Sequence, residues 1–206
     1  MYLIKSNFLL RTLYPHRIWR KNTVGEKILY LTFDDGPHET ATSFALQQLK
    51  KFGAKATFFC IGKNIVAHPD IFQQILKDGH AAGNHTFEHL NGWKTAAGAY
   101  LGSIHQTEKL TDSPLFRPPY GRMKKQQEQI FLQENPQHKI VMWSVLSGDF
   151  DTKISGEKCW NNILKNAESG AIIVFHDSAK AFERMQYALP KTLQYFSEKG
   201  FLFESL

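Results

Sequence analysis

Short apolar runs alternate with longer amphipathic stretches along this chain, and no other feature restricts its fold as strongly. The runs 28–33 and 171–175 are rich in aliphatic, aromatic and β-branched residues, as expected for strands buried on both faces. The stretch 40–52 instead has apolar residues at helical spacing and is followed by Gly53, a residue suited to end a helix. Strands that alternate with helices are typical of an α/β domain with a largely parallel sheet.

The same criteria predict the remaining elements. Strands are expected at 28–33, 56–61, 115–116, 140–145, 171–175 and 201–203. Helices are expected at 40–52, 69–82, 95–110, 123–133, 156–167 and 181–199, with a turn at Gly83 and Asn84. We find no repeat, linker or low-complexity segment, so the 206 residues are expected to form one domain.

Composition excludes several classes of protein. A hydrophobic content of 42% with 21% charged residues is that of an ordinary globular protein, not of a disordered or membrane chain. The net charge of +6 comes from scattered lysines and arginines, and the longest basic cluster, Arg122 to Lys125, is short. We therefore expect a solvated helix face there and no nucleic-acid partner.

The two cysteines and the start of the chain bear on compartment. Cys60 and Cys159 lie in apolar surroundings and are expected to be buried free thiols. The first eleven residues are interrupted by Lys5 and Arg11, so we expect no signal peptide, and no stretch reaches the roughly 18 apolar residues of a transmembrane helix. The default expectation is a cytoplasmic protein, with a membrane-associated start left open; the oligomeric state is not predicted.

Polar residues follow several of the expected strands at the point where each strand ends. Asp34 and Asp35 follow the first strand, and Arg117, Asp149 and His176 follow later ones. Because the carboxyl ends of parallel strands meet on one face, we expect these side chains to lie close together.

Asp34 and Asp35, combined with His85 and His89, predict a metal site. An unpaired buried carboxylate is costly, which favours a cation beside the aspartate pair. Two imidazoles four residues apart would project from one face of a helical turn that Asn84 caps. Taken alone, the H-x-x-x-H spacing is better explained by two surface histidines than by a metal site. With one aspartate added, it makes a typical set of ligands for a catalytic divalent cation.

The other motifs suggest proton transfer. If Asp35 is the ligand, Asp34 is free to act as general base toward water acidified by the cation. Arg117 would hold that carboxylate, and the Pro118-Pro119 segment would present a backbone N–H to an oxyanion. Taken alone, this stretch is explained equally well as an ordinary proline turn with a surface arginine. His176 is a candidate general acid whose pKa Asp149 would raise, although a core histidine is the alternative. Asp151 and Asp177 are further candidates for the role of Asp149, or for capping.

These segments closely resemble the polysaccharide deacetylase family, also called the NodB-homology domain or carbohydrate esterase family 4, from about Ile28 to about Asp177. The five motifs occur in the family's order, at 32–37, 85–89, 117–121, 146–150 and 174–176. The resemblance implies that Asp34 is the base and that Asp35, His85 and His89 are metal ligands. It also implies that Arg117 clamps Asp34, that the Tyr120 backbone N–H is the oxyanion donor, and that His176 is the acid, tuned by Asp149.

The resemblance also sets expectations for the pocket and the fold. Phe150 stands where the family often has a tryptophan that lines the acetyl-methyl pocket, and Val174 stands where leucine is usual. With Pro119, these residues would form an apolar wall of altered shape. The implied fold is a distorted (β/α) barrel with about seven parallel strands, with 1–26 as an N-terminal extension and 27–206 as the catalytic domain.

The leading functional hypothesis is a metal-dependent hydrolase that removes the acetyl group from an N-acetylated sugar or polysaccharide. Zn²⁺ is the expected metal, with Co²⁺ or Ni²⁺ as alternatives. A catalytically silent carbohydrate-binding domain and a hydrolase of non-sugar amides are the other hypotheses. The identity of the glycan, whether peptidoglycan, a chitin-like oligosaccharide or another N-acetylhexosamine polymer, is not predicted.

Overall fold

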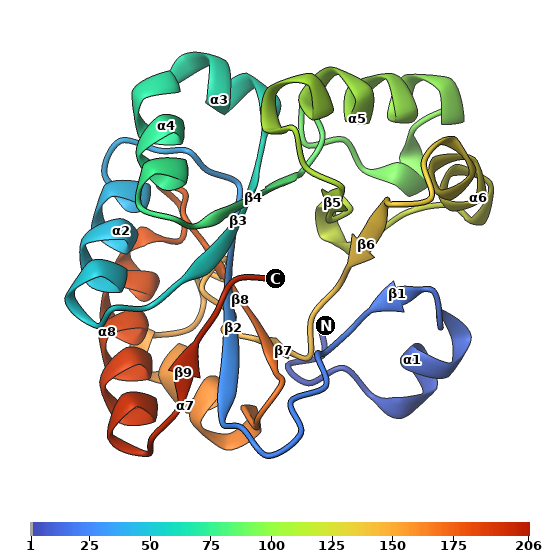
Figure 1. The fold of residues 1–206 in the computed structure, drawn as a ribbon. Helices are drawn as coiled ribbons and strands as arrows, with labels where there is room; N and C mark the ends of the chain where they lie inside the picture. The colour runs from blue at the N-terminus through green and yellow to red at the C-terminus, as the bar shows by residue number, and fades with distance from the viewer. Residues whose placement is uncertain (1) are drawn as a thin grey trace.

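The structure of the protein is a computed structural model that describes residues 2–206, and its centre is a single parallel sheet (Figure 1). The sheet is nine-stranded with the order β1-β6-β5-β4-β3-β2-β8-β7, and β9 pairs with β2. Every pairing of neighbouring strands is parallel. The strands are β1 (Arg17–Ile18), β2 (Ile28–Asp34), β3 (Ala56–Cys60), β4 (Ala81–Asn84), β5 (Leu115–Phe116), β6 (Lys139–Val141), β7 (Val145–Leu146), β8 (Ile172–His176) and β9 (Leu202–Phe203). The predicted α/β class and distorted barrel are confirmed, with slightly more strands than the seven expected.

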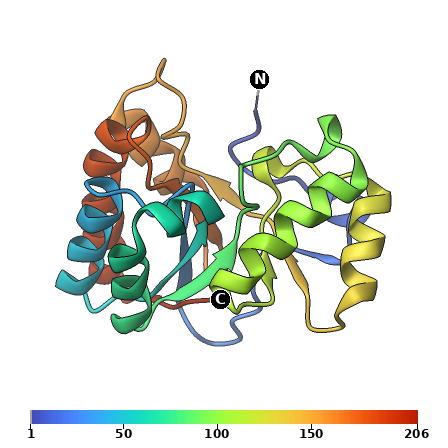
Figure 2. The same ribbon diagram turned by 90° about the horizontal axis from the view of Figure 1, so that it is seen from above.

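Helices cover the outer face of this curved sheet. In Figures 1 and 2, α2, α4, α7 and α8 lie on one side of the molecule, and α5 and α6 lie on the other. The helices are α1 (Phe8–Leu13), α2 (Ala41–Lys51), α3 (Gly62–Ala67), α4 (Pro69–Lys77), α5 (Ala97–Thr111), α6 (Lys125–Glu134), α7 (Gly156–Asn166) and α8 (Phe182–Glu198), with short 3₁₀ turns η1 (Gly92–Lys94) and η2 (Pro119–Gly121). No helix of residues 2–206 is long and apolar enough to cross a membrane.

Side chains alternate across the strands, so each strand contributes to two cores. Leu31 and Phe33 of β2 pack outward with the helices, whereas Tyr30 packs with Ile172 inside the barrel. Thr32, Asp34, Val174 and His176 continue the inward series because side chains two residues apart share a face. The inward-facing positions of β2 and β8 therefore end in the polar residues Asp34 and His176.

Two predicted elements were wrong in their bounds. The helix expected at 69–82 ends at Lys77, where Gly79 at φ +75° reverses the chain, and 81–84 forms the buried strand β4 instead of a helix end and turn. The small residues Ala81, Ala82 and Gly83 suit either state, and Gly83 is required because a Cβ there would lie 2.6 Å from the Phe59 ring. The strand expected at 140–145 is two strands, β6 and β7, that lie far apart in the sheet order.

Residues before β2 also join the sheet, although we expected no element there. β1 pairs with β6, and Lys5 bridges Val145 of β7 in the antiparallel sense. The division into an extension at 1–26 and a catalytic domain at 27–206 stays a prediction. The expected free thiols are confirmed, because Cys60 and Cys159 are both buried and unbridged.

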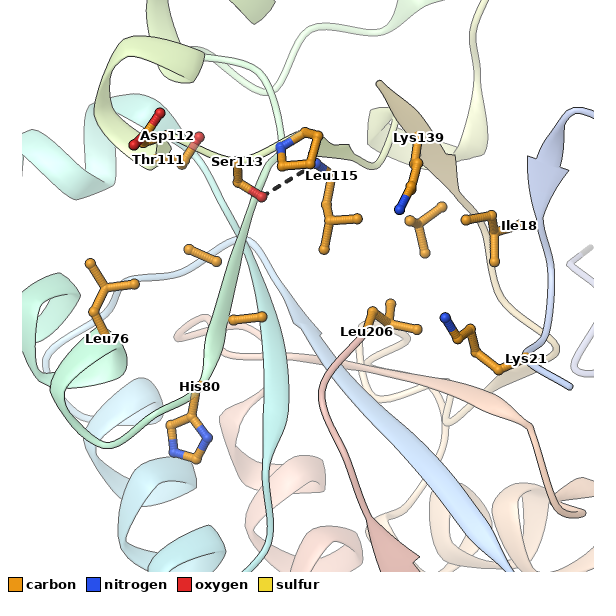
Figure 3. Close-up of a pocket in the computed structure, with 14 residues that line it drawn as sticks. Ile18, Lys21, Leu76, His80, Thr111, Asp112, Ser113, Leu115, Lys139 and Leu206 are labelled. Atoms are coloured by element: carbon orange, nitrogen blue, oxygen red, sulfur yellow. Dashed lines mark hydrogen bonds between the residues drawn. The ribbon is translucent and has the colours of Figure 1, made fainter. Parts of the chain in front are cut away.

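One cavity, of about 430 Å³, lies at the amino-terminal ends of the strands. Its lining includes Ala81, Leu115 and Lys139, which begin or adjoin the starts of β4, β5 and β6. Figure 3 shows Lys21 and Lys139 reaching toward it, and Leu206, which follows β9, among the other lining side chains. Because the strands all run in the same direction, this cavity lies at the opposite end of the sheet from Asp34 and His176, so it is not where the predicted chemistry converges.

Candidate active site

Asp35, His85 and His89 form a compact cluster just beyond the carboxyl ends of β2 and β4. The Asp35 Oδ1 atom lies 3.2 Å from His89 Nε2 and 3.6 Å from His85 Nε2. One ligand atom from each residue can be chosen so that all three lie within 4.8 Å of one another. The three side chains that the sequence predicted as metal ligands are therefore brought together.

The loop that presents the two histidines is not a helical turn, so that prediction was wrong. Thr86 and His89 have φ of 62° and 58°, in the left-handed region. Asn84 does organise the segment, but by accepting a hydrogen bond from the Thr86 backbone N–H at 2.9 Å while its amide donates to the Ile104 carbonyl at 2.8 Å. The ligand spacing comes from an irregular loop after β4.

Backbone strain is concentrated at this site. Five non-glycine residues in 2–206 have positive φ, and four of them are Asp35, Thr86, His89 and Tyr120. The backbone carbonyl of Asp35, at φ 83°, accepts a hydrogen bond of 2.7 Å from the Asn64 amide. Such conformations cost about 1–3 kcal/mol each and persist where the surrounding structure holds them, as at functional sites.

The donor set fits a divalent cation. Asp35 Oδ1 is buried and accepts no well-aligned hydrogen bond from the described residues. Burial alone would raise the pKa of Asp35, but the imidazoles of His89 and His176 lower it below its ordinary value. His85 Nδ1 lies 2.7 Å from the Arg117 carbonyl, which can only accept, so Nδ1 carries the proton and Nε2 offers a lone pair. Burial lowers the pKa of His85 to about 4, which keeps that imidazole neutral and able to ligate.

Asp34 and Arg117 form a buried ion pair next to the cluster. Arg117 Nη1 donates to Asp34 Oδ1 at 2.7 Å and to Thr32 Oγ1 at 2.7 Å. The other guanidinium nitrogens donate to the carbonyls of Val141 and Met142, and the Phe59 ring lies 4.1 Å beneath the guanidinium carbon. Thr32 was not among the predicted site residues; its inward position on β2, two residues before Asp34, is the signal that could have identified it.

His176 and Asp149 form a second pair, on the other side of Asp34. His176 is the register partner of Asp34 across β2 and β8. Its Nδ1 lies 2.8 Å from Asp149 Oδ1, and its backbone N–H donates to Asp149 Oδ2 at 2.7 Å. Burial alone would lower the pKa of His176, but the charge and hydrogen bond of Asp149 raise it to about 9.

Asp149 owes its position to residues that the sequence analysis missed. Arg184 Nε donates to the Asp149 carbonyl at 2.7 Å, and the Asn162 amide donates to the Ser147 carbonyl at 2.9 Å. Both come from helices α7 and α8, distant in sequence from the motif. The alternative candidates lie elsewhere: Asp151 bonds Tyr2, and Asp177 accepts from the Gly36 backbone N–H at 3.0 Å and from Thr42 Oγ1 at 2.5 Å.

The remaining predicted residues surround these groups. Phe150 packs with its ring edge-on to His176, at a centroid distance of 5.1 Å. Val174 is buried on the inner face of β8, and Pro119 is buried in η2. The Tyr120 side chain is largely exposed, and its ring lies 4.6 Å from that of His89.

The fold and the site together define a parallel β/α barrel protein with a carboxylate and two-histidine centre. The family model described as polysaccharide deacetylase matches residues 21–135, and the chain belongs to this family. A peptidoglycan-N-acetylglucosamine deacetylase from Bacillus cereus is 34% identical over 185 residues, which cover 86% of this chain and 85% of that one. A chitooligosaccharide deacetylase from Azorhizobium caulinodans is 37% identical over 166 residues, covering 75% and 76%.

A solved structure supports the same placement. It is a peptidoglycan N-acetylglucosamine deacetylase in complex with 4-naphthalen-1-yl-N-oxidanyl-benzamide, and it superposes with a TM-score of 0.87 at 30% identity. The match covers 96% of this chain and 94% of that one, so nearly the whole chain shares the fold of that structure.

Proposed function

We propose that this protein hydrolyses the N-acetyl group of an N-acetylated glycan, giving acetate and a free amine. The observation that carries the proposal is the convergence of three groups with different tasks at one end of the barrel. Asp35 and the two imidazoles form the proposed cation site, and Arg117 holds the carboxylate of Asp34. The third group is the His176 imidazole, which bonds Asp149. Amide hydrolysis requires a base, an electrophile and an acid, and this arrangement supplies all three.

Asp34 acts as the base. Its Oδ1 atom is held by Arg117, and Oδ2 is the proposed proton acceptor for the attacking water. Asp35, His85 and His89 would hold a divalent cation, which would supply the Lewis acidity that lowers the pKa of water and polarises an acyl oxygen. The Tyr120 backbone N–H is the proposed hydrogen-bond donor to that oxygen as negative charge develops.

His176 acts as the acid. Because Nδ1 is engaged by Asp149, Nε2 is the nitrogen that delivers a proton to the departing amine. A pKa of about 9 keeps the imidazole protonated at neutral pH, as an acid for this step must be. Phe150, Val174 and Pro119 form the proposed apolar wall for the acetyl methyl group.

Zn²⁺ is the proposed cation, since two imidazoles and one carboxylate form a typical catalytic zinc set. The proposed substrates are glycans that contain N-acetylglucosamine, because the relatives from Bacillus cereus and Azorhizobium caulinodans are named for peptidoglycan and chitooligosaccharide deacetylation.

Metal analysis joined to an acetate-release screen tests the proposal. The protein is stripped with chelator, reloaded with Zn²⁺, and assayed on chitooligosaccharides and peptidoglycan for acetate and free amine. We expect one bound zinc per chain, activity that depends on it, and stabilisation by about 2.7 kcal/mol at zinc 100-fold above its Kd. His89→Ala should lose both binding and activity. Failure of the wild-type chain to take up zinc, or zinc uptake without acetate release from any glycan, would overturn the proposal; the second result would leave a silent binding domain.

A further inference from the structure

Residues 2–6, which the proposed chemistry does not use, run along the edge strand β7. This strand pairs with β8, which ends at His176. The Leu146 backbone N–H donates to the Ile4 carbonyl at 2.8 Å, and the Ser6 N–H donates to the Ser144 carbonyl at 3.0 Å. Since the Lys5 bridge to Val145 is antiparallel, the chain before Lys5 extends toward the carboxyl end of β7. This direction brings Tyr2 to the turn that holds Asp149 and Phe150.

Tyr2 contacts that turn with both parts of its side chain. Its ring packs against Phe150 at a centroid distance of 4.8 Å, and its hydroxyl donates to Asp151 Oδ2 at 2.9 Å. Burial and the neighbouring Asp151 raise the pKa of Tyr2 to about 12, so the hydroxyl keeps the proton that it donates. Gly148 makes room for this contact: at φ +87° it suits glycine, and a Cβ there would lie 3.3 Å from the Tyr2 hydroxyl oxygen.

The contacts form a chain that ends at the acid. Tyr2 packs on one side of the Phe150 ring, and the Phe150 ring meets the His176 imidazole at 5.1 Å and an interplanar angle of 68°. Arg184 and Asn162 hold the backbone of residues 147 and 149, but neither bonds Phe150 or Asp151.

We propose that Tyr2 is a positioning residue for deacetylation: acting through Phe150, its side chain holds the aromatic wall beside His176 and so helps to shape the acyl pocket. The inference rests on the proposed function. It implies that the Tyr2 ring sets the room available to the acyl group, because a Phe150 side chain without its packing partner can swing away from His176. Acyl-chain selectivity should therefore depend on Tyr2.

The test compares Tyr2→Ala with Tyr2→Phe, which keeps the ring and removes only the hydroxyl, and with Leu3→Ala, a neighbouring exposed position. For Tyr2→Ala we expect kcat/KM on an N-acetyl substrate to fall about tenfold, less than the roughly hundredfold cost of a 1 Å misplacement. The rate on the N-propionyl analogue relative to N-acetyl should rise several-fold. Tyr2→Phe should keep the selectivity of the wild-type protein, and Leu3→Ala should change neither quantity.

A second readout does not depend on turnover. The Phe150 ring shifts the NMR signals of the His176 imidazole protons through its ring current, and these signals should move in Tyr2→Ala but not in Tyr2→Phe or Leu3→Ala. If Tyr2→Ala does not fold, Tyr2→Leu, which keeps apolar volume without an aromatic ring, serves in its place. Unchanged selectivity together with unchanged His176 signals would overturn the inference. A wild-type protein that releases no acetate would overturn the proposed function instead, and the NMR comparison would still decide whether Tyr2 positions Phe150.

Discussion

Among residues 2–206, two arginine–carboxylate pairs are buried, one at the proposed active site and one between β1 and α6, and their carboxylates are hydrogen-bonded differently. Arg17 and Glu128 make three hydrogen bonds that engage both carboxylate oxygens, at 3.2, 3.2 and 2.7 Å. Arg117 makes one hydrogen bond to Asp34, at 2.7 Å to Oδ1, and gives its other donors to Thr32 and two backbone carbonyls.

The surroundings of the two guanidinium groups are otherwise alike. Each lies over an aromatic ring, Arg17 over Tyr14 at 4.2 Å and Arg117 over Phe59 at 4.1 Å, and each is nearly or fully buried. The difference is therefore in the carboxylate. A fully bonded carboxylate such as that of Glu128 is suited to hold β1 against α6, whereas one with a free oxygen keeps capacity to accept a proton.

The largest effect should follow Asp34→Asn. The amide can still accept a hydrogen bond from Arg117, but it is far too weak a base for the proposed proton transfer, so acetate release should fall by about 10²–10⁴-fold or more. Zinc content should stay near one per chain, because Asp35, His85 and His89 are untouched. Elemental analysis beside the acetate assay checks both; near wild-type turnover would remove Asp34 from the role of base.

The opposite pattern is expected for Glu128→Leu. Leaving Arg17 buried without its partner should destabilise the fold by roughly 3–5 kcal/mol, while turnover per folded molecule stays close to wild type. Urea unfolding measures the loss. The double variant Arg17→Met with Glu128→Leu should recover most of it, since the uncompensated charge is then absent. A large loss of kcat in the folded single variant would contradict the structural role of this pair.

The smallest of the three effects concerns His176 and pH. Its pKa is raised from 6.5 to about 9, so the pair with Asp149 contributes stability that is fully present below pH 6.5 and is lost as pH rises through about 9. For metal-free protein we expect the free energy of unfolding to fall by about 1–3 kcal/mol over this range. Asp149→Asn should flatten that dependence. Equal slopes for the two proteins, measured by urea unfolding at several pH values, would show that Asp149 does not set the charge of His176.

Sequence patterns predicted most strands and helices of the barrel, because each of these elements forms from a contiguous stretch of the chain. Buried strands such as 28–34 and 172–176 read as apolar runs, and the motifs that follow them are contiguous. The predicted elements were wrong where the local sequence suits a helix and a strand equally well, or where one apolar run spans two strands. Ala81 to Gly83 fits a helix or a strand, and only pairing with β3 and β5 decides for the strand. The single apolar run around 140–145 does not reveal that β6 and β7 occupy distant places in the sheet.

For the site, the sequence by itself identified the groups of the proposed chemistry: an aspartate pair, two histidines four residues apart, Arg117, Asp149 and His176. Only the tertiary structure decided how these groups are held. The left-handed backbone at Thr86 and His89 and the inward position of Thr32 depend on contacts between segments distant in sequence. The same is true of the contacts that Arg184, Asn162 and Tyr2 make with residues 147–150. Local propensity cannot encode such contacts, because they stabilise the structure only once the barrel has brought those segments together.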